Sequence, residues 1–290
     1  MLLNKEILIG IYDSQPYLDT GAEEYFNAVV ANGASINVSA RTAVNNFIIG
    51  LKNDEIWNSI YDMGLFAGVT SRAGALVKVK TVLASRLLIN NNFISGAYVP
   101  TGSTAGFKAN GSNTYLDTQF NPSSTGTNPQ SCSLTDFGIF AYWAGIETAS
   151  SYVMGIQSTT SPLASIGLGW SSSNKEGGAI GALNLTGEIS PASSPTSLNG
   201  PSLITTNGDR SQYYYNKGTQ ISTPITATGT AFPSQSIVIG AMGVVGSTPY
   251  LWSTRYIRGY AITKGLNATQ AQKLSTRWNT LMTAFGANTY

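Results

Sequence analysis

The sequence predicts a mainly β protein, a sandwich or barrel with a small helical region before it and a single helix after it. Between residues 101 and 265, short runs rich in aromatic and β-branched residues alternate with clusters of Gly, Pro, Asn and Ser. Only 10% of the 290 residues are charged and 31 are Gly, a composition typical of a β protein with many polar turns. The last segment of the chain has the residue spacing of one amphipathic helix.

The predicted body comprises residues 101–290. Its longest apolar run extends from Leu134 to Trp143. A hairpin is expected at residues 211–218, where Lys217 separates Asn216 from Gly218 and favours a three-residue turn. Strands are expected within residues 114–117, 134–143, 152–156, 166–170, 203–206, 213–216, 237–239 and 256–262. We find no internal repeat, so the body is one unit.

The helix that ends the chain is the best-defined element. Asn267 is a good N-cap, Gln270 stands where a capping box needs its acceptor, and Gly286 is a natural stop. One apolar face is formed by Ala271, Leu274, Trp278, Leu281, Met282 and Phe285. We expect this face to dock on the sandwich, with Trp278 buried.

Residues 1–66 are predicted to form an N-terminal arm and a helical attachment region. The apolar stretch from Leu2 to Tyr12 ends at a turn signal, Asp13 to Pro16, and is either a short strand or an arm that packs on a neighbouring subunit. A first helix is expected from the N-cap candidate Thr20, with Glu23 completing a capping box. Its apolar face is Tyr25, Phe26, Val29 and Val30.

A second helix is indicated by apolar residues at helical spacing: Ala40, Val44, Phe47, Ile48 and Leu51. Asn53 is expected to cap a short third helix containing Glu55, Ile56, Trp57 and Ile60. Three such helices have too small a core to fold alone, so they lean on the sandwich or on another chain. Deletion of residues 1–66 is therefore expected to leave a soluble, monomeric sandwich. Residues 67–100 are predicted to be an irregular linker packed on the body.

Two segments resemble a known family. The closing segment YIRGYAITKGLNATQAQKLSTRWNTLMTAFG, preceded by SIVIGAMG, is similar to the end of the concanavalin A-like (laminin-G-like) jelly-roll domains of bacteriophage structural proteins. The segment from TGAEEYFNAVVANG to LKNDEIWNSIYDMGLFAG resembles the short helical region that often precedes such a domain. The resemblance implies a concanavalin-like jelly-roll β-sandwich and a place in a virion. Both segments consist of packing residues, and neither carries a catalytic motif.

Charge and composition exclude several classes of protein. The formal net charge of +2, without a basic stripe, argues against nucleic-acid binding. No apolar run approaches the length that spans a membrane, and no signal peptide is evident at the start. Sparse charge favours association with other protein. The single Cys132, expected to be a small buried hydrophobe, leaves no intramolecular disulfide and suits assembly in a host cytoplasm.

Catalytic patterns are weak throughout the chain. The absence of His excludes Ser-His-Asp and Cys-His chemistry. A retaining glycosidase needs two carboxylates about 5–5.5 Å apart, which on one strand means positions i and i+2. The acids of the β-rich part are instead isolated: Asp117, Asp136, Glu147, Glu176, Glu188 and Asp209. The loop at Asn207 to Asp209 is favoured as a hairpin turn over a calcium site. We therefore expect no enzyme activity and assign no catalytic, cofactor-binding or metal-binding residue.

Aromatic residues are the remaining candidates for binding. An exposed pair within Tyr213, Tyr214 and Tyr215 would stack on sugars, but one core tyrosine and two on a partly covered face is the better interpretation. Trp170 and Trp252 flank loops rich in small residues and are rim candidates, whereas Trp57, Trp143 and Trp278 have the spacing of core residues. The sequence assigns no glycan-binding residues.

The favoured function is that of a non-enzymatic virion structural protein of a bacteriophage (tail, fibre, baseplate or capsid decoration), attached through its N-terminal region. Its expected partners are other virion proteins and further copies of itself, most simply in a trimer by analogy with phage fibres. One alternative is a receptor-recognition protein that binds a host surface glycan through the sandwich. A second alternative is a depolymerase that cleaves host polysaccharide.

Overall fold

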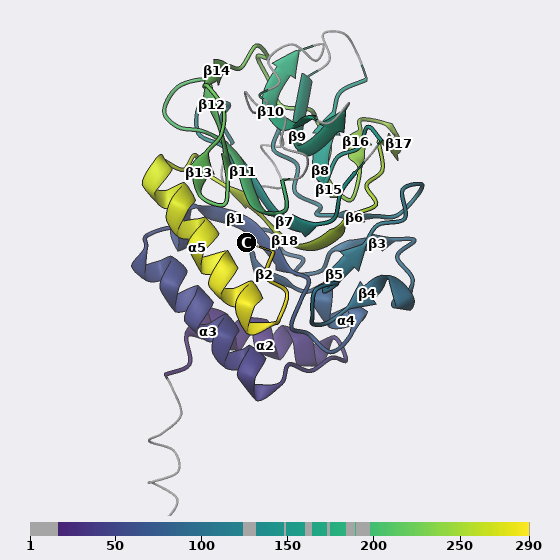
Figure 1. Cartoon of the computed structure of the whole chain (residues 1–290), viewed down its shortest axis with the longest axis vertical. Coiled ribbons are helices and arrows are strands. Elements are labelled where there is room, and N and C mark those ends of the chain that lie inside the picture. The colour runs from purple at the N-terminus through teal and green to yellow at the C-terminus, as the bar shows by residue number, and fades with distance from the viewer. Residues whose placement is uncertain are drawn as a thin grey trace, which may run out of the picture.

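The computed structural model describes residues 17–123, 132–147, 149–159, 164–172, 175–183, 189 and 198–289. These residues form three layers: two sheets packed face to face and a layer of helices on the outer face of one sheet (Figure 1). The arrangement confirms the predicted mainly β sandwich with helices at both ends of the chain. None of the helices in the described part is long and apolar enough to cross a membrane.

The first sheet has the strand order β13-β12-β11-β7-β18-β1-β2, with β14 paired to β12 and the β4–β5 hairpin joined to β18. Its strands are β1 (Ile60–Leu65), β2 (Lys78–Thr81), β4 (Tyr98–Val99), β5 (Gly106–Lys108), β7 (Gly138–Ala144), β11 (Gly200–Thr206), β12 (Ser211–Asn216), β13 (Thr219–Gln220), β14 (Ile225–Thr226) and β18 (Tyr256–Thr263). At its centre, β18 lies between β7 and β1 and is antiparallel to both.

The second sheet has the order β10-β9-β8-β15-β6-β3, with β16 parallel to β8 and paired to β17. Its strands are β3 (Ile89–Asn91), β6 (Tyr115–Asp117), β8 (Met154–Gln157), β9 (Ala164–Ser172), β10 (Lys175–Leu183), β15 (Val238–Ile239), β16 (Met242–Val244) and β17 (Ser247–Tyr250). All the other pairings of this sheet are antiparallel.

The first sheet has a core on each of its faces. Along β7, Ile139, Ala141 and Trp143 join the cluster between the sheets, whereas Phe140 and Tyr142 join the cluster beneath the helices. This alternation follows from the two-residue period of a strand. A strand buried on both sides is apolar throughout, which explains the long run at residues 134–143 in the sequence.

The closing helix α5 (Ala268–Ala284) has the predicted caps and docks where expected. Asn267 Oδ1 accepts from the Gln270 N–H at 3.0 Å, and Gln270 Oε1 accepts from the Asn267 N–H at 3.1 Å. The Trp278 ring is fully buried, with its centroid 5.2 Å from those of both Phe47 and Phe140. The ring lies so close to Gly259 of β18 that a Cβ there would stand 2.4 Å from it.

The first two helices complete the helical layer, which we define as α2 (Thr20–Ala31), α3 (Val38–Asn53) and α5. The N-cap of α2 is Asp19, one residue before the predicted Thr20, and its carboxylate accepts from the Gly21 N–H at 2.8 Å. Val30, predicted to face the core, is 63% exposed because it lies about 100° around the helix from the buried Val29.

Helix α3 is capped by Asn37, whose side chain accepts from the Ala40 N–H at 2.8 Å. The five apolar residues predicted to form its inner face, Ala40, Val44, Phe47, Ile48 and Leu51, are all buried. They pack in one cluster with residues of α5 and of the first sheet. Of the two supports predicted for these helices, the sandwich or another chain, the structure shows packing on the sandwich.

The prediction of a short third helix from Asn53 through Ile60 is wrong, as is the helical reading of the residues up to 66. Asn53 ends α3, Glu55 adopts a left-handed backbone with φ of 61°, and only one 3₁₀ turn, Trp57–Ser59, follows. The next six residues form β1, which is buried throughout because it pairs with β18 on one side and β2 on the other. Deletion of residues 1–66 would remove an inner strand of the first sheet, so that deletion is no longer expected to leave a folded sandwich.

Residues 67–100 supply elements to both sheets. They contain the short helix α4 (Arg72–Ala75), the strands β2, β3 and β4, and a 3₁₀ turn at Ser95–Ala97. Strand β2 ends the first sheet and β3 ends the second. The domain boundaries themselves remain a prediction, and the expected strand or arm at residues 2–12 lies outside the described residues.

Candidate functional site

The acidic side chains examined as catalytic candidates serve the local backbone. Asp117 Oδ1 accepts from the Gln119 N–H, Asp136 Oδ1 from the Gly265 N–H and Asp209 Oδ1 from the Ser211 N–H, at 2.7 to 2.8 Å. Asp209 thereby closes the turn next to Gly208, as the hairpin interpretation predicted. The side chains of Glu176 and Glu188 lie outside the described residues. No group of three potential metal ligands occurs among the residues that the structure describes.

One acidic group, not among the predicted candidates, lies in the core. Asp62 of β1 and Lys78 of β2 are fully buried, with Asp62 Oδ2 2.9 Å from Lys78 Nζ. The same carboxylate accepts from Thr81 Oγ1 at 2.7 Å and from the Tyr260 hydroxyl. Lys78 Nζ also donates to the Thr118 carbonyl at 2.6 Å. This buried polar cluster joins three strands of the first sheet to the second sheet and is closed to a ligand.

An aromatic surface is formed where the segment following β17 meets β6 of the second sheet, and Trp252 is its centre. We call it the Trp252 ledge, comprising Tyr115, Tyr250, Leu251 and Trp252. The rings of Tyr115 and Trp252 lie 5.9 Å apart at 43°, and both side chains are partly exposed. Tyr250 is 39% exposed, and its hydroxyl bonds to Gln157 Oε1. A partly exposed aromatic pair of this kind offers an apolar face with polar tips.

The backbone beneath the ledge is held in an unusual conformation. Leu251 has a φ of 52°, in the left-handed region that large side chains rarely adopt. This conformation is held by hydrogen bonds to the residues that follow Leu251. The Glu147 carboxylate accepts from Ser253 Oγ at 3.1 Å and from the Thr254 N–H at 2.9 Å. Such strain in a rigid frame is found preferentially at functional sites.

A polar loop borders the ledge. Asn110 Oδ1 accepts from the N–H groups of Ser112 and Asn113, both at 3.0 Å, and fixes a tight turn. The Gly111 N–H donates to the Ser253 carbonyl at 2.9 Å, which ties this turn to the segment that carries Trp252. Ser112 and Asn113 are exposed. The ledge therefore has hydroxyl and amide groups close to its aromatic face.

The other aromatic candidates are placed as follows. Tyr214 is buried between the sheets, Tyr215 is buried beneath the helices, and Tyr213 is partly buried against the same helix-side cluster. This confirms the interpretation of the tyrosine triplet as packing residues. Trp143 is core as predicted, and Trp57 is partly buried against the helix-side cluster. The side chain of Trp170 lies outside the described residues.

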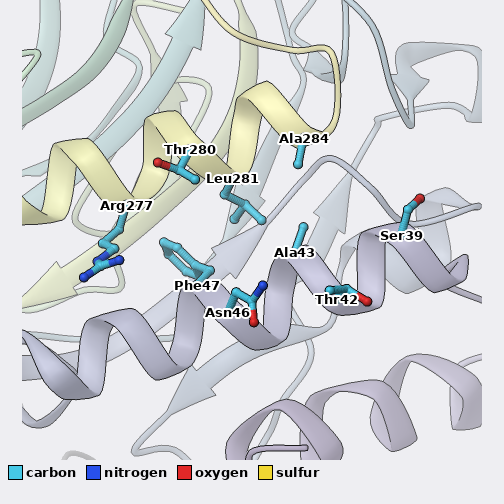
Figure 2. A pocket seen from close by; sticks show the side chains of 9 residues that line it. All are labelled: Ser39, Thr42, Ala43, Asn46, Phe47, Arg277, Thr280, Leu281 and Ala284. Atoms are coloured by element: carbon cyan, nitrogen blue, oxygen red, sulfur yellow. The ribbon is translucent and has the colours of Figure 1, made fainter. Parts of the chain in front are cut away.

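A groove in the helical layer is the second candidate surface. It lies between α3 and α5, has a volume of about 340 Å³, and opens to solvent (Figure 2). Its lining residues are Ser39, Thr42, Ala43, Asn46 and Phe47 of α3, with Arg277, Thr280, Leu281 and Ala284 of α5. Figure 2 shows Phe47, Ala43 and Leu281 pointing toward one another across the gap between the helices. We call this the α3–α5 groove.

One end of the groove is fixed by ion pairs. Arg277 Nε lies 2.7 Å from Asp54 Oδ2, and Lys273 Nζ lies 3.5 Å from Asp54 Oδ1. The hydrogen bond from Arg277, together with the positive charge of both cations, lowers the pKa of the Asp54 carboxyl. Because Asp54 follows α3 directly, these contacts hold the end of that helix against α5. The width of the groove is set at this end.

Sequence reasoning found only part of these surfaces. Trp252 was a rim candidate because it stands beside a loop of small residues, but Tyr115 and Leu251 carried no signal. Cys132, expected to be buried, is half-buried against the sandwich core, and burial raises the pKa of its thiol to about 12. The thiol is thereby kept protonated and unreactive.

Solved structures resemble the chain in fold. Trypanosoma rangeli sialidase in complex with 2,3-difluorosialic acid is 15% identical with a TM-score of 0.51, over 80% of this chain and 34% of the sialidase. A mutant of the protein designated HCR/D is 14% identical with a TM-score of 0.51, over 76% of this chain and 52% of that one. The botulinum neurotoxin serotype D binding domain, at a TM-score of 0.48 and 14% identity over 76% of this chain and 52% of the domain, adds no argument.

The sialidase and HCR/D matches support a shared β-sandwich fold and nothing finer. The chain spans about a third of the sialidase's length and about half that of the other two. No family model and no curated protein matches the sequence. A sandwich of this kind serves both enzymes and binding domains, so function has to be argued from the surfaces of this chain.

Proposed function

We propose that this chain is a non-enzymatic structural component of a bacteriophage virion, attached to the particle through the N-terminal part of its helical layer. The observation that carries the proposal is the exposure of large apolar side chains at that end. Tyr17 is 77% exposed, Val38 79% and Val30 63%. All three belong to the first two helices or to the residues leading into them. Large apolar side chains exposed in one region of the chain are candidates for contact with other protein.

The proposed lack of enzyme activity is supported by the structural roles of the described Asp and Glu side chains. The described carboxylates that were candidates for glycoside cleavage cap turns or bind backbone N–H groups, and the chain has no His. Asp62, the most buried acid, is enclosed with Lys78 and out of reach of a substrate. These roles are structural, and among the acids that the structure describes they leave no pair of carboxylates for acid–base work.

Attachment is tested by placing a charge on the exposed apolar surface. We expect Val38→Asp, in the full chain, to fold normally and to be lost from purified particles, because Val38 is exposed on the isolated chain and covered in the assembled particle. Asp near a helix N-terminus is also compatible with the helix dipole. Incorporation is measured by the amount of variant protein in particles assembled in infected cells that lack the native copy.

Ile146→Asp is the matched control. Ile146 is 64% exposed, but it lies beside the sandwich segment that carries Glu147 rather than on the helical layer. We expect this variant to be incorporated like the native chain. Normal incorporation of Val38→Asp would move the attachment surface away from the helices. Equal loss of both variants would show a general effect of charge.

A second candidate function, recognition of a host surface glycan, is favoured specifically by the Trp252 ledge. Pyranose rings present an apolar face that packs on aromatic rings, and their hydroxyls bond to amide and hydroxyl groups such as those of Ser112 and Asn113. The fixed frame beneath Leu251 keeps the ring of Trp252 in place, which reduces the entropy lost on binding.

For this candidate, we expect the full chain to bind immobilised host polysaccharide and Trp252→Ala to weaken that binding roughly 2- to 10-fold, the equivalent of about 0.5–1.5 kcal/mol for an aromatic contact. Trp252→Phe, which keeps a ring, should retain most of the affinity. The measurement is a glycan array followed by titration calorimetry on the best ligand. Binding that is unaffected by either substitution would place the glycan elsewhere, and no binding by the native chain would remove this candidate.

A further inference from the structure

The α3–α5 groove is shaped to accept a short extended segment with apolar side chains. Its walls are formed by Ala43 and Phe47 of α3 and by Leu281 and Ala284 of α5, while hydroxyl and amide groups stand at its edges (Figure 2). Residues four apart on one helix repeat along the groove at about 6 Å. Every second side chain of an extended segment repeats at nearly the same distance, about 6.8 Å.

The chain itself contains a segment that fits this description. Within residues 1–16, which precede the first described residue, apolar side chains occur at Leu2, Leu3, Ile7, Leu8, Ile9 and Ile11. Ile7, Ile9 and Ile11 would share one face of an extended segment. Eleven residues in extended form reach about 36 Å, so the segment is long enough to lie along the groove.

We propose that the α3–α5 groove of each copy is occupied by residues 2–12 of a second copy of this chain. The inference rests on the proposed virion role, and it names the partner at the helical layer. Exchange of arms around a ring closes a cyclic oligomer, in which every groove is filled and no arm is left exposed. The trimer expected from the sequence is the simplest such ring and stays a proposal.

Two observations favour a second copy over the chain's own arm. The Tyr17 carbonyl accepts from Asn45 Nδ2 at 2.9 Å, and the Asp19 N–H donates to Asn45 Oδ1 at 2.8 Å. Asn45 lies about 100° around α3 from its neighbour Asn46, which lines the groove. A chain leaving Tyr17 would therefore have to turn around α3 to enter the groove of its own molecule.

The second observation is the exposed apolar surface outside the groove. An arm folded back on its own molecule would fill the groove and still leave Tyr17 and Val38, at 77% and 79% exposure, in water. In the proposed ring, a neighbouring copy that contributes its arm would also bring its body against this layer and cover them. Burial of these side chains adds to the stability of the assembled state.

The test separates the arm from the groove. One variant lacks residues 1–16 and keeps the groove. The other keeps the arm and carries Ala284→Trp, which fills the groove from the exposed side of α5. We expect the native chain to sediment as an oligomer and each variant alone as a folded monomer, with a native circular dichroism spectrum and a cooperative melting transition. Mixed together, the two variants should form a one-to-one complex, because one supplies the only arm and the other the only open groove.

Thr269→Trp is the matched control, since Thr269 is exposed on α5 and does not line the groove; it should leave the oligomer intact. A native chain that is monomeric, an oligomer that survives removal of residues 1–16, or a mixture that fails to combine would each overturn the inference. Occupation by the chain's own arm would appear as a native monomer. Ala284→Trp, if it fails to fold, is replaced by Ala43→Trp on the opposite wall.

Particle incorporation is scored separately from oligomeric state. A native chain that sediments as a monomer but is incorporated normally would overturn the arm exchange while the attachment role stands. An oligomer that assembles as expected but never enters particles would overturn the attachment role and leave the arm exchange in place.

Discussion

Replacement of Trp278 by Ala is expected to destabilise the protein by roughly 3–5 kcal/mol, the usual cost of removing a core aromatic. The ring is fully buried and contacts Phe47 of α3, Phe140 of β7 and the backbone at Gly259 of β18. This one substitution therefore removes contacts that hold α3 and α5 to the first sheet. The measurement is urea unfolding followed by circular dichroism, at constant protein concentration because association shifts apparent stability.

Trp278→Phe is the control for this prediction. The indole N–H of Trp278 has no hydrogen-bond acceptor among the described residues, so the smaller ring loses contacts but leaves no partner unpaired. We expect a clearly smaller loss than for Ala. A Trp278→Ala variant that unfolds at the native urea concentration would mean that α5 does not hold the helical layer to the sheet.

Replacement of Asp62 by Ala is expected to cost about 3–5 kcal/mol as well, because it leaves the Lys78 ammonium buried without its counter-ion. The carboxylate also accepts from Thr81 and Tyr260, so two further donors lose their acceptor. The same urea titration measures this loss of stability. Because Asp62 is fully buried, the substitution leaves the protein surface unchanged.

The double variant Asp62→Ala/Lys78→Met tests whether the loss of stability in Asp62→Ala comes from the unpaired Lys78 ammonium. Removing both charges abolishes the unpaired ammonium, so we expect the double variant to be more stable than Asp62→Ala alone, in clear violation of additivity. Strictly additive losses would show that the two charges do not interact in the folded state. The buried cluster would then be a set of independent hydrogen bonds.

The elements that sequence reasoning placed well are those whose signals are local. The caps and apolar face of α5 lie within twenty residues of one another, and α3 repeats its buried side chains at helical spacing. Strand β1 was mistaken for helix because its identity depends on pairing with β18, almost two hundred residues later, and because Asp62 masks its apolar character. Tertiary pairing overrides local propensity in such a segment.

The candidate surfaces were harder to predict for the same reason. Trp252 stood out beside its loop, but its neighbour Tyr115 comes from a distant strand, and the left-handed Leu251 is an unusual choice for that conformation. The groove exists only because α3 and α5 lie side by side, and no short-range pattern in the sequence predicts that arrangement. The buried pair Asp62–Lys78 appears in the sequence only as single charges within apolar runs.

The pairing of β1 with β18 also orders events during synthesis. Ile60 pairs with Thr263 and Leu65 with Gly259, so β1, which is synthesised early, cannot pair with β18 until almost the whole chain has been made. Until that partner leaves the ribosome, the apolar faces of α2 and α3 have neither sheet nor α5 to cover them. Contacts so distant in sequence form slowly, and the waiting chain is open to aggregation or to capture by chaperones. A product cut short before β18 cannot complete the first sheet and leaves β1 and β7 without their shared partner.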